Sequence, residues 1–138
     1  MNNTIKNQAK TESIILVPIY NEQKHIFNVL REVRKYSPED LLVVNDGSTD
    51  ESREIVEEIA SCAKLKGKLI IINHSENKGY GKSLIDGINF AQENNYRKFG
   101  LYLYRSCSPA ALLQLNYFYK PESRVEEGGR ILRFLSGL

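Results

Sequence analysis

The chain has 138 residues, of which 26% are charged and 41% hydrophobic, and its formal net charge is +2. This length and composition predict one globular domain and exclude a disordered or collagen-like protein, while the small net charge argues against a dedicated nucleic-acid binder. Two cysteines are too few for a disulfide framework or a four-cysteine zinc site, and no apolar run reaches the roughly 20 residues that cross a bilayer.

Residues 1–13 form a polar leader without the apolar centre of a secretory signal, so we expect a cytoplasmic protein. A continuous apolar run over residues 14–18 is typical of a strand buried on both faces, and Pro18 is expected to end it. The apolar spacing over 26–33 predicts a helix, with Asn21 as its N-cap.

The same unit then repeats. Residues 41–44 predict a second buried strand, and a capping box at Ser48 and Glu51 is expected to open a helix whose apolar stripe runs to residue 63. Residues 69–72, 84–91 and 99–104 predict a strand, a helix and a fourth strand. This alternation predicts an α/β fold, with a Rossmann-like parallel sheet and flanking helices.

The pattern changes after about residue 100. Aspartate stops at Asp86, aromatic residues crowd the last 38 positions, and residues 105–138 show no clear period. We expect this atypical tail to pack loosely, and the uncovered sheet to promote self-association. We predict that the tail arose from a reading-frame change or truncation near residue 100, with a designed or domain-swapped ending as the alternative.

Three polar loops follow the predicted strands, at the sheet edge where open parallel sheets bind ligands. The carboxylates of Glu22 and Asp46 can accept hydrogen bonds from ribose hydroxyls and base N–H groups, and Tyr20 offers a flat face for stacking. Lys78 and Lys82 stand beside two glycines, where a helix N-terminus can meet a diphosphate. Together the loops predict a nucleotide site.

Simpler interpretations exist for each of these residues. Asp46 and Gly47 are typical of a turn, Ser48 can be a cap, and a single lysine is usually solvated. The histidines, His25 and His74, are expected to be structural or exposed.

Two phosphate-binding motifs fail in the third loop. The sequence GKS over residues 81–83 resembles the end of a P-loop, but Glu76 stands where that motif requires glycine. The dinucleotide fingerprint fails because Leu84 replaces its last glycine.

The segments VPIYNE (17–22), VNDGSTD (44–50) and NKGYGK (77–82) together resemble the family 2 glycosyltransferases. The third segment is most similar to the polyprenyl-phosphate branch, of the dolichol-phosphate mannose type. This resemblance covers residues 14 to about 99 and implies the N-terminal half of a GT-A fold. It also implies a nucleotide-diphospho-sugar donor, an acceptor such as a polyprenyl phosphate, and a peripheral position on a membrane surface.

The resemblance assigns residues to this site. It implies that Pro18, Tyr20, Glu22 and Asp46 surround the nucleoside and that residues 78–82 lie beside the donor phosphates. The complete predicted set is Pro18, Tyr20, Glu22, Asp46, Gly47, Ser48, Lys78, Gly79 and Lys82, and no catalytic residue is assigned.

The family pattern next requires a strand ending in Asp-x-Asp, which holds Mg²⁺ or Mn²⁺ against the diphosphate. Residues 100–106 read GLYLYRS, and no aspartate follows Asp86. We therefore predict a nucleotide-sugar-binding half over residues 14–104 that lacks metal ligands and is inactive alone. The alternative from another class is a non-catalytic nucleotide-binding remnant or module, and a third alternative is a P-loop-type phosphate binder.

Overall fold

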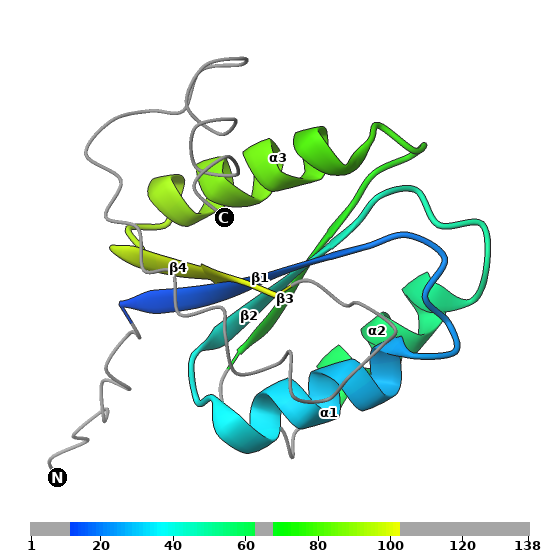
Figure 1. The fold of residues 1–138 in the computed structure, drawn as a ribbon, viewed down its shortest axis with the longest axis horizontal. Helices are drawn as coiled ribbons and strands as arrows, with labels where there is room; N and C mark the ends of the chain where they lie inside the picture. The colour runs from blue at the N-terminus through cyan, green and yellow to red at the C-terminus, as the bar shows by residue number, and fades with distance from the viewer. Residues whose placement is uncertain (1–11, 63–67, 103–138) are drawn as a thin grey trace, which may run out of the picture.

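The computed structural model describes residues 12–62 and 68–102, which form a sheet with helices on both faces (Figure 1). The strands are β1 (Ser13–Ile19), β2 (Asp40–Asn45), β3 (Leu69–Asn73) and β4 (Lys98–Leu101), and the helices are α1 (Ile26–Tyr36), α2 (Ser52–Ser61) and α3 (Tyr80–Glu93). The predicted α/β class and its alternation are confirmed. Most of the leader, residues 103 and 104 of the predicted fourth strand, and the tail over 105–138 lie outside the described residues.

All described strands are parallel, in the order β3-β2-β1-β4. Every residue of β2 is buried, because this strand has a neighbour on each side and helices over both faces. The last register pairs join Ile19 to Asn45 and Asn45 to Asn73. The loops after β1, β2 and β3 therefore leave the sheet at one edge, on the right in Figure 1.

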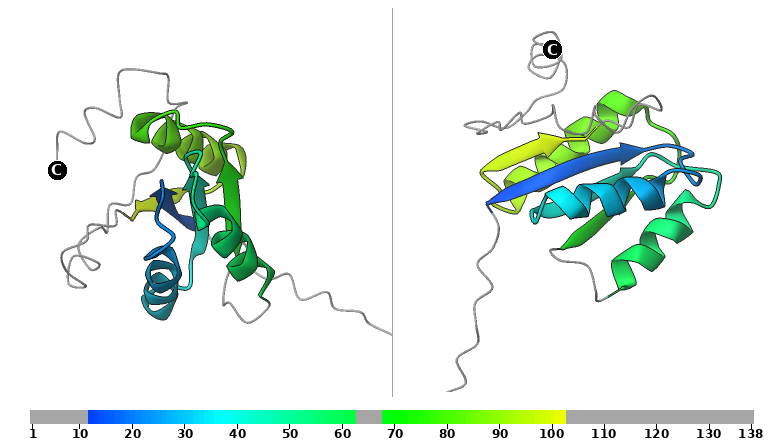
Figure 2. Two further views of the ribbon diagram at one scale, coloured as in Figure 1. Left: turned by 90° about the vertical axis from the view of Figure 1, so that its right-hand side faces the viewer. Right: turned by 60° about the horizontal axis from the view of Figure 1, so that its bottom comes forward.

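Side-chain alternation along the strands creates two apolar layers. Leu16 and Leu42 pack toward α3, whereas Val17 and Val43 pack toward α1 and α2. Figure 2 shows these helices on the two faces of the sheet. α3 approaches β1 closely, since a Cβ on Gly87 would lie 2.4 Å from a methyl carbon of Leu16. Among the described residues, no helix is long and apolar enough to span a membrane.

Pro18 does not end the first strand as predicted. β1 continues to Ile19, and Pro18 pairs in register with Val44. Leu16 accepts a hydrogen bond from Tyr102 on the β4 side, and residues two apart in a strand face the same neighbour. The backbone nitrogen of Pro18 therefore faces away from β2, so the lack of an N–H on proline removes no hydrogen bond to β2. On the β4 side, Pro18 lies beyond the last register pair, which joins Leu16 to Leu101.

Both predicted helix caps are wrong. α1 begins at Ile26, five residues after Asn21, which adopts a φ of 53° instead of capping the helix. α2 begins at Ser52 rather than behind Ser48, and Asp50 accepts the N–H of Ser52. Asn21 and Ser48, which were expected to cap helices, instead form hydrogen bonds that join the loop after β1 to the loop after β2.

Candidate functional site

Two of the three loops are joined by reciprocal hydrogen bonds. We call residues 20–25 loop 1, residues 46–51 loop 2 and residues 74–79 loop 3. The N–H of Asn21 donates to Ser48 Oγ at 3.0 Å, and the N–H of Thr49 donates back to Asn21 Oδ1 at 2.8 Å. The hydroxyl of Ser48, a predicted ligand contact, thus accepts a bond that positions loop 1.

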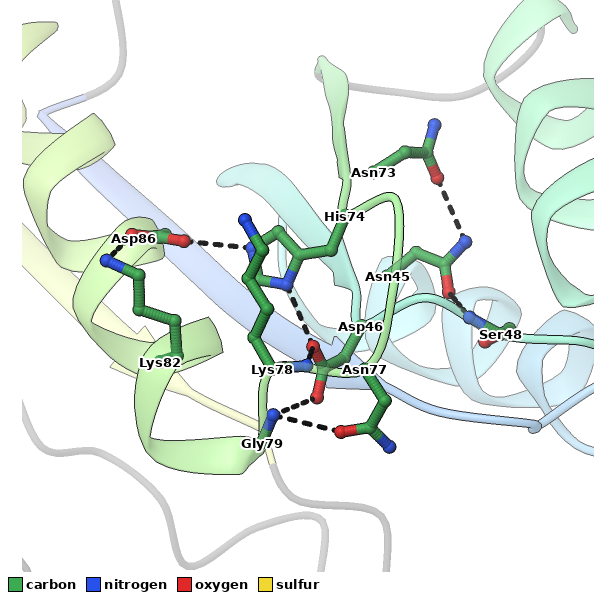
Figure 3. A network of polar contacts seen from close by, with 10 residues as sticks. All are labelled: Asn45, Asp46, Ser48, Asn73, His74, Asn77, Lys78, Gly79, Lys82 and Asp86. Carbon is green, nitrogen blue, oxygen red and sulfur yellow. Dashed lines mark hydrogen bonds and ion pairs between the residues drawn. The ribbon is translucent and has the colours of Figure 1, made fainter.

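Loop 3 wraps around the carboxylate of Asp46 (Figure 3). Oδ1 accepts the N–H of Lys78 at 2.8 Å and lies 2.8 Å from His74 Nδ1, while Oδ2 accepts the N–H of Gly79 at 3.0 Å. The side chain of Asp46 is 5% exposed. The predicted nucleoside anchor is therefore also the residue that holds loop 3 in place.

Gly47 lets loops 2 and 3 meet at the backbone. Its φ is +67°, and a Cβ there would lie 2.2 Å from the carbonyl carbon of Glu76 and 2.5 Å from the nitrogen of Asn77. Any residue with a Cβ at position 47 would therefore require the backbone of loop 2 or loop 3 to shift. Gly47 thus has the turn conformation of the simpler interpretation, and it also permits the loop contact.

The network continues from Asp46 into α3. His74 Nε2 lies 2.9 Å from Asp86 Oδ2, and Asp86 Oδ1 pairs with Lys82 Nζ at 3.1 Å. The His74 side chain is 4% exposed. A chain of contacts therefore connects Asp46, at the end of β2, with Lys82 in the first turns of α3 (Figure 3).

Sequence reasoning missed His74 and Asp86 as part of the site. His74 directly follows Asn73, whose register partner Asn45 directly precedes Asp46, so the pairing of β2 with β3 sets the two side chains beside each other. Asp86 follows Lys82 by one helical turn, which was the available signal for an ion pair.

The side chains of several other predicted residues are not part of this network. Pro18 lies within β1, and Tyr20 is 44% exposed at its end. Among the described residues, no hydrogen bond or ion pair joins the side chains of Tyr20, Glu22 or Lys78 to Asp46. These groups remain available for a ligand at the same edge.

Hydrogen bonding sets the charge of the carboxylates. Burial alone raises the pKa of Asp46, but the hydrogen bonds from His74, Lys78 and Gly79 outweigh it and hold the pKa below its ordinary value. The pKa of Glu22 is raised, mainly by burial, with His25 opposing the shift. Asp46 is therefore ionised at neutral pH and suited to accept N–H donors.

We expect acid to weaken the closure of loop 3. Because the folded-state pKa of Asp46 lies below its unfolded value, its contribution is complete above an ordinary aspartate pKa of about 3.9 and is lost as pH falls through the lower folded value. Urea unfolding at about pH 6 and about pH 3 measures this, with Asp46→Asn as control. Identical pH dependence in both proteins would contradict the assignment.

The described residues do not fit the family's metal. Within residues 12–62 and 68–102, no group of three or more His, Cys, Asp or Glu is arranged to hold an ion. Residues 103–106, where the resemblance expects metal ligands, lie outside the described part of the chain. The predicted lack of ligands thus stays a prediction.

Comparison with known proteins identifies the family. A family model described as glycosyl transferase family 2 matches residues 14–96, more than half of the chain. The chain belongs to glycosyltransferase family 2. All three loops fall within the matched range, so this family 2 segment contains the complete network around Asp46.

Similar proteins support the fold and the family. The UDP-N-acetylglucosamine–dolichyl-phosphate N-acetylglucosaminyltransferase of Methanococcus voltae is 32% identical over 88 residues, covering 57% of this chain and 35% of the relative. The structure of Staphylococcus aureus TarS 1–349 in complex with UDP is 26% identical with a TM-score of 0.52, covering 65% of this chain and 26% of TarS.

A third protein resembles the chain in fold alone. The mannosyltransferase PcManGT from Pyrobaculum calidifontis, solved in complex with GDP-Man and Mn²⁺, has a TM-score of 0.55 at 19% identity, covering 71% of this chain and 30% of the other. The predicted GT-A-type sheet is confirmed by these structural neighbours. The chain spans only about a third of the length of the curated relatives it matches.

Proposed function

We propose that residues 14–104 bind the nucleoside diphosphate part of a nucleotide-sugar donor at loops 1, 2 and 3. The observation that carries this proposal is the network around Asp46, which holds the carboxylates of Asp46 and Asp86, the backbone of Lys78 and the ammonium group of Lys82 at the carboxyl edge of a parallel sheet. The structures of similar proteins in complex with UDP and with GDP-Man support a nucleotide as the ligand.

Each side of the proposed site suits a different part of the donor. An ionised carboxylate has about four lone-pair positions, and Asp46 uses three of them within the protein, which leaves one for a base N–H. The exposed ring of Tyr20 suits stacking, and the half-buried carboxylate of Glu22 suits ribose hydroxyls.

The phosphate side lies at the start of α3. Gly79 is the N-cap and supplies no side-chain cap, and the first turn carries no acidic residue. The positive end of the helix dipole therefore favours an anion there, beside the ammonium groups of Lys78 and Lys82.

We further propose that the acceptor is a polyprenyl phosphate at a membrane surface and that this chain alone does not transfer sugar. The Methanococcus relative, named for a dolichyl-phosphate acceptor, supports the first part. The second part rests on the sequence, in which no aspartate follows Asp86 to form the Asp-x-Asp of the family pattern. Losing one stabilising donor already costs about 10²–10³ in rate.

Calorimetric titration of the chain with UDP, GDP, uridine and guanosine tests donor binding. We expect one diphosphate to bind, and Lys82→Ala to weaken it by about tenfold, as loss of a charge-assisted contact does. Lys98→Ala, at the opposite edge of the sheet, is the matched control and should bind as the wild type does. Absence of binding to every nucleotide would reject the proposal.

Transfer is tested separately with nucleotide sugars, Mn²⁺ and polyprenyl phosphate. Turnover by the wild-type chain that Asp46→Asn abolishes would contradict the proposed inactivity. Binding of diphosphate without preference for a nucleoside would instead favour the simple phosphate binder.

A further inference from the structure

His74 lies between two carboxylates that come from different elements. Its Nδ1 is 2.8 Å from Asp46 Oδ1 on loop 2, and its Nε2 is 2.9 Å from Asp86 Oδ2 on α3. The ring is almost fully buried, so water does not replace either contact. Figure 3 shows the ring spanning the two acidic side chains.

The protonation of the ring follows from this geometry. A neutral imidazole has one N–H, so it would place an unprotonated nitrogen against one ionised carboxylate. Only a ring that carries both protons can donate to both acids. With Lys82 on Asp86, the network then holds two carboxylates and two cations, and Asp46 also accepts the N–H groups of Lys78 and Gly79.

We infer that His74 is a positioning residue, a cation that holds Asp46 and Asp86 together and thereby makes Lys82 able to turn to a phosphate. The consequence for ligand binding rests on the proposed function, whereas the bridge itself does not.

The coupling works through the second partner of Asp86. A phosphate that approaches Lys82 competes with Asp86 for the same ammonium group. While His74 donates to Asp86, the carboxylate keeps one cationic partner when Lys82 moves away. Without the ring, Asp86 loses its contact at Oδ2, and the partly buried acid would hold Lys82 back from the phosphate.

The ratio of diphosphate affinity to nucleoside affinity separates this role from a purely structural one. We expect His74→Gln to lower this ratio by about tenfold. The variant weakens the charge-assisted contact between Lys82 and phosphate, which a diphosphate makes and a nucleoside does not. Asp86→Asn, added to His74→Gln, removes the competing charge and should restore the ratio to near that of the wild type. An equal loss of affinity for the nucleoside diphosphate and for the nucleoside, which Asp86→Asn does not restore, would overturn the inference.

A ligand-free measurement tests the bridge independently. The chain has two histidines, so His25→Gln leaves His74 as the only one and makes its ring signals unambiguous. Nitrogen-15 NMR at neutral pH should show protons on both ring nitrogens, protected from solvent exchange. One unprotonated ring nitrogen would overturn the inference. If no nucleotide binds, the proposed function fails while this measurement still decides the bridge.

Discussion

The Asp46→Ala variant is expected to lose about 3–5 kcal/mol of unfolding free energy, because it breaks a buried ionic contact by removing one partner. The change leaves the N–H groups of Lys78 and Gly79 without their acceptor and His74 with one carboxylate instead of two. Since a domain is stable by only about 5–15 kcal/mol, urea unfolding should show a large shift of the midpoint.

Asp50→Ala is the matched control for this variant. Asp50 also accepts two backbone N–H groups, from Gln23 and Ser52, but it is only half-buried. Losing such a cap costs about 0.5–2 kcal/mol. An Asp46→Ala loss no larger than that of Asp50→Ala would mean that the network around His74 contributes little.

Gly47→Ala is expected to be at least as damaging, at about 3 kcal/mol or more, since a positive φ alone costs about 1–3 kcal/mol. The added Cβ would also overlap backbone atoms of Glu76 and Asn77, at 2.2 and 2.5 Å, and backbone cannot move as a flexible side chain does. Loops 2 and 3 would separate, so we expect nucleotide binding to disappear together with stability.

Two other glycines of the same region separate the causes. Gly79 has a φ of +91° and open space around its Cβ position, so Gly79→Ala isolates the backbone cost. Gly81 has neither constraint and lies in the first turn of α3, where alanine should stabilise by about 0.5–1 kcal/mol. Equal effects of the three substitutions in thermal unfolding would refute the close approach of the loops.

The first three strands were predictable from sequence because each carries an unbroken apolar run. Residues 41–44 have to be hydrophobic throughout, since β2 is covered on both faces and paired on both sides. The alternation with amphipathic helices then leaves few topologies, and the α/β class follows.

The loop contacts were not predictable in the same way. Asn21 and Ser48 have the composition of caps, but their partners lie 27 or 28 residues away, and no local pattern carries that distance. His74 was missed for the same reason, because its partners are set by the register of β2 with β3 and by the place of α3.

The most direct test of a nucleotide site at this edge is an amide-resolved NMR titration of the chain with UDP and with GDP. We expect one of them to shift the amide signals of Tyr20, Asp46 and Gly79 together, while signals at the opposite edge, such as those of Asp40 and Lys98, stay in place. Shifts that cluster away from the three loops, or no shifts with either nucleotide, would contradict the account.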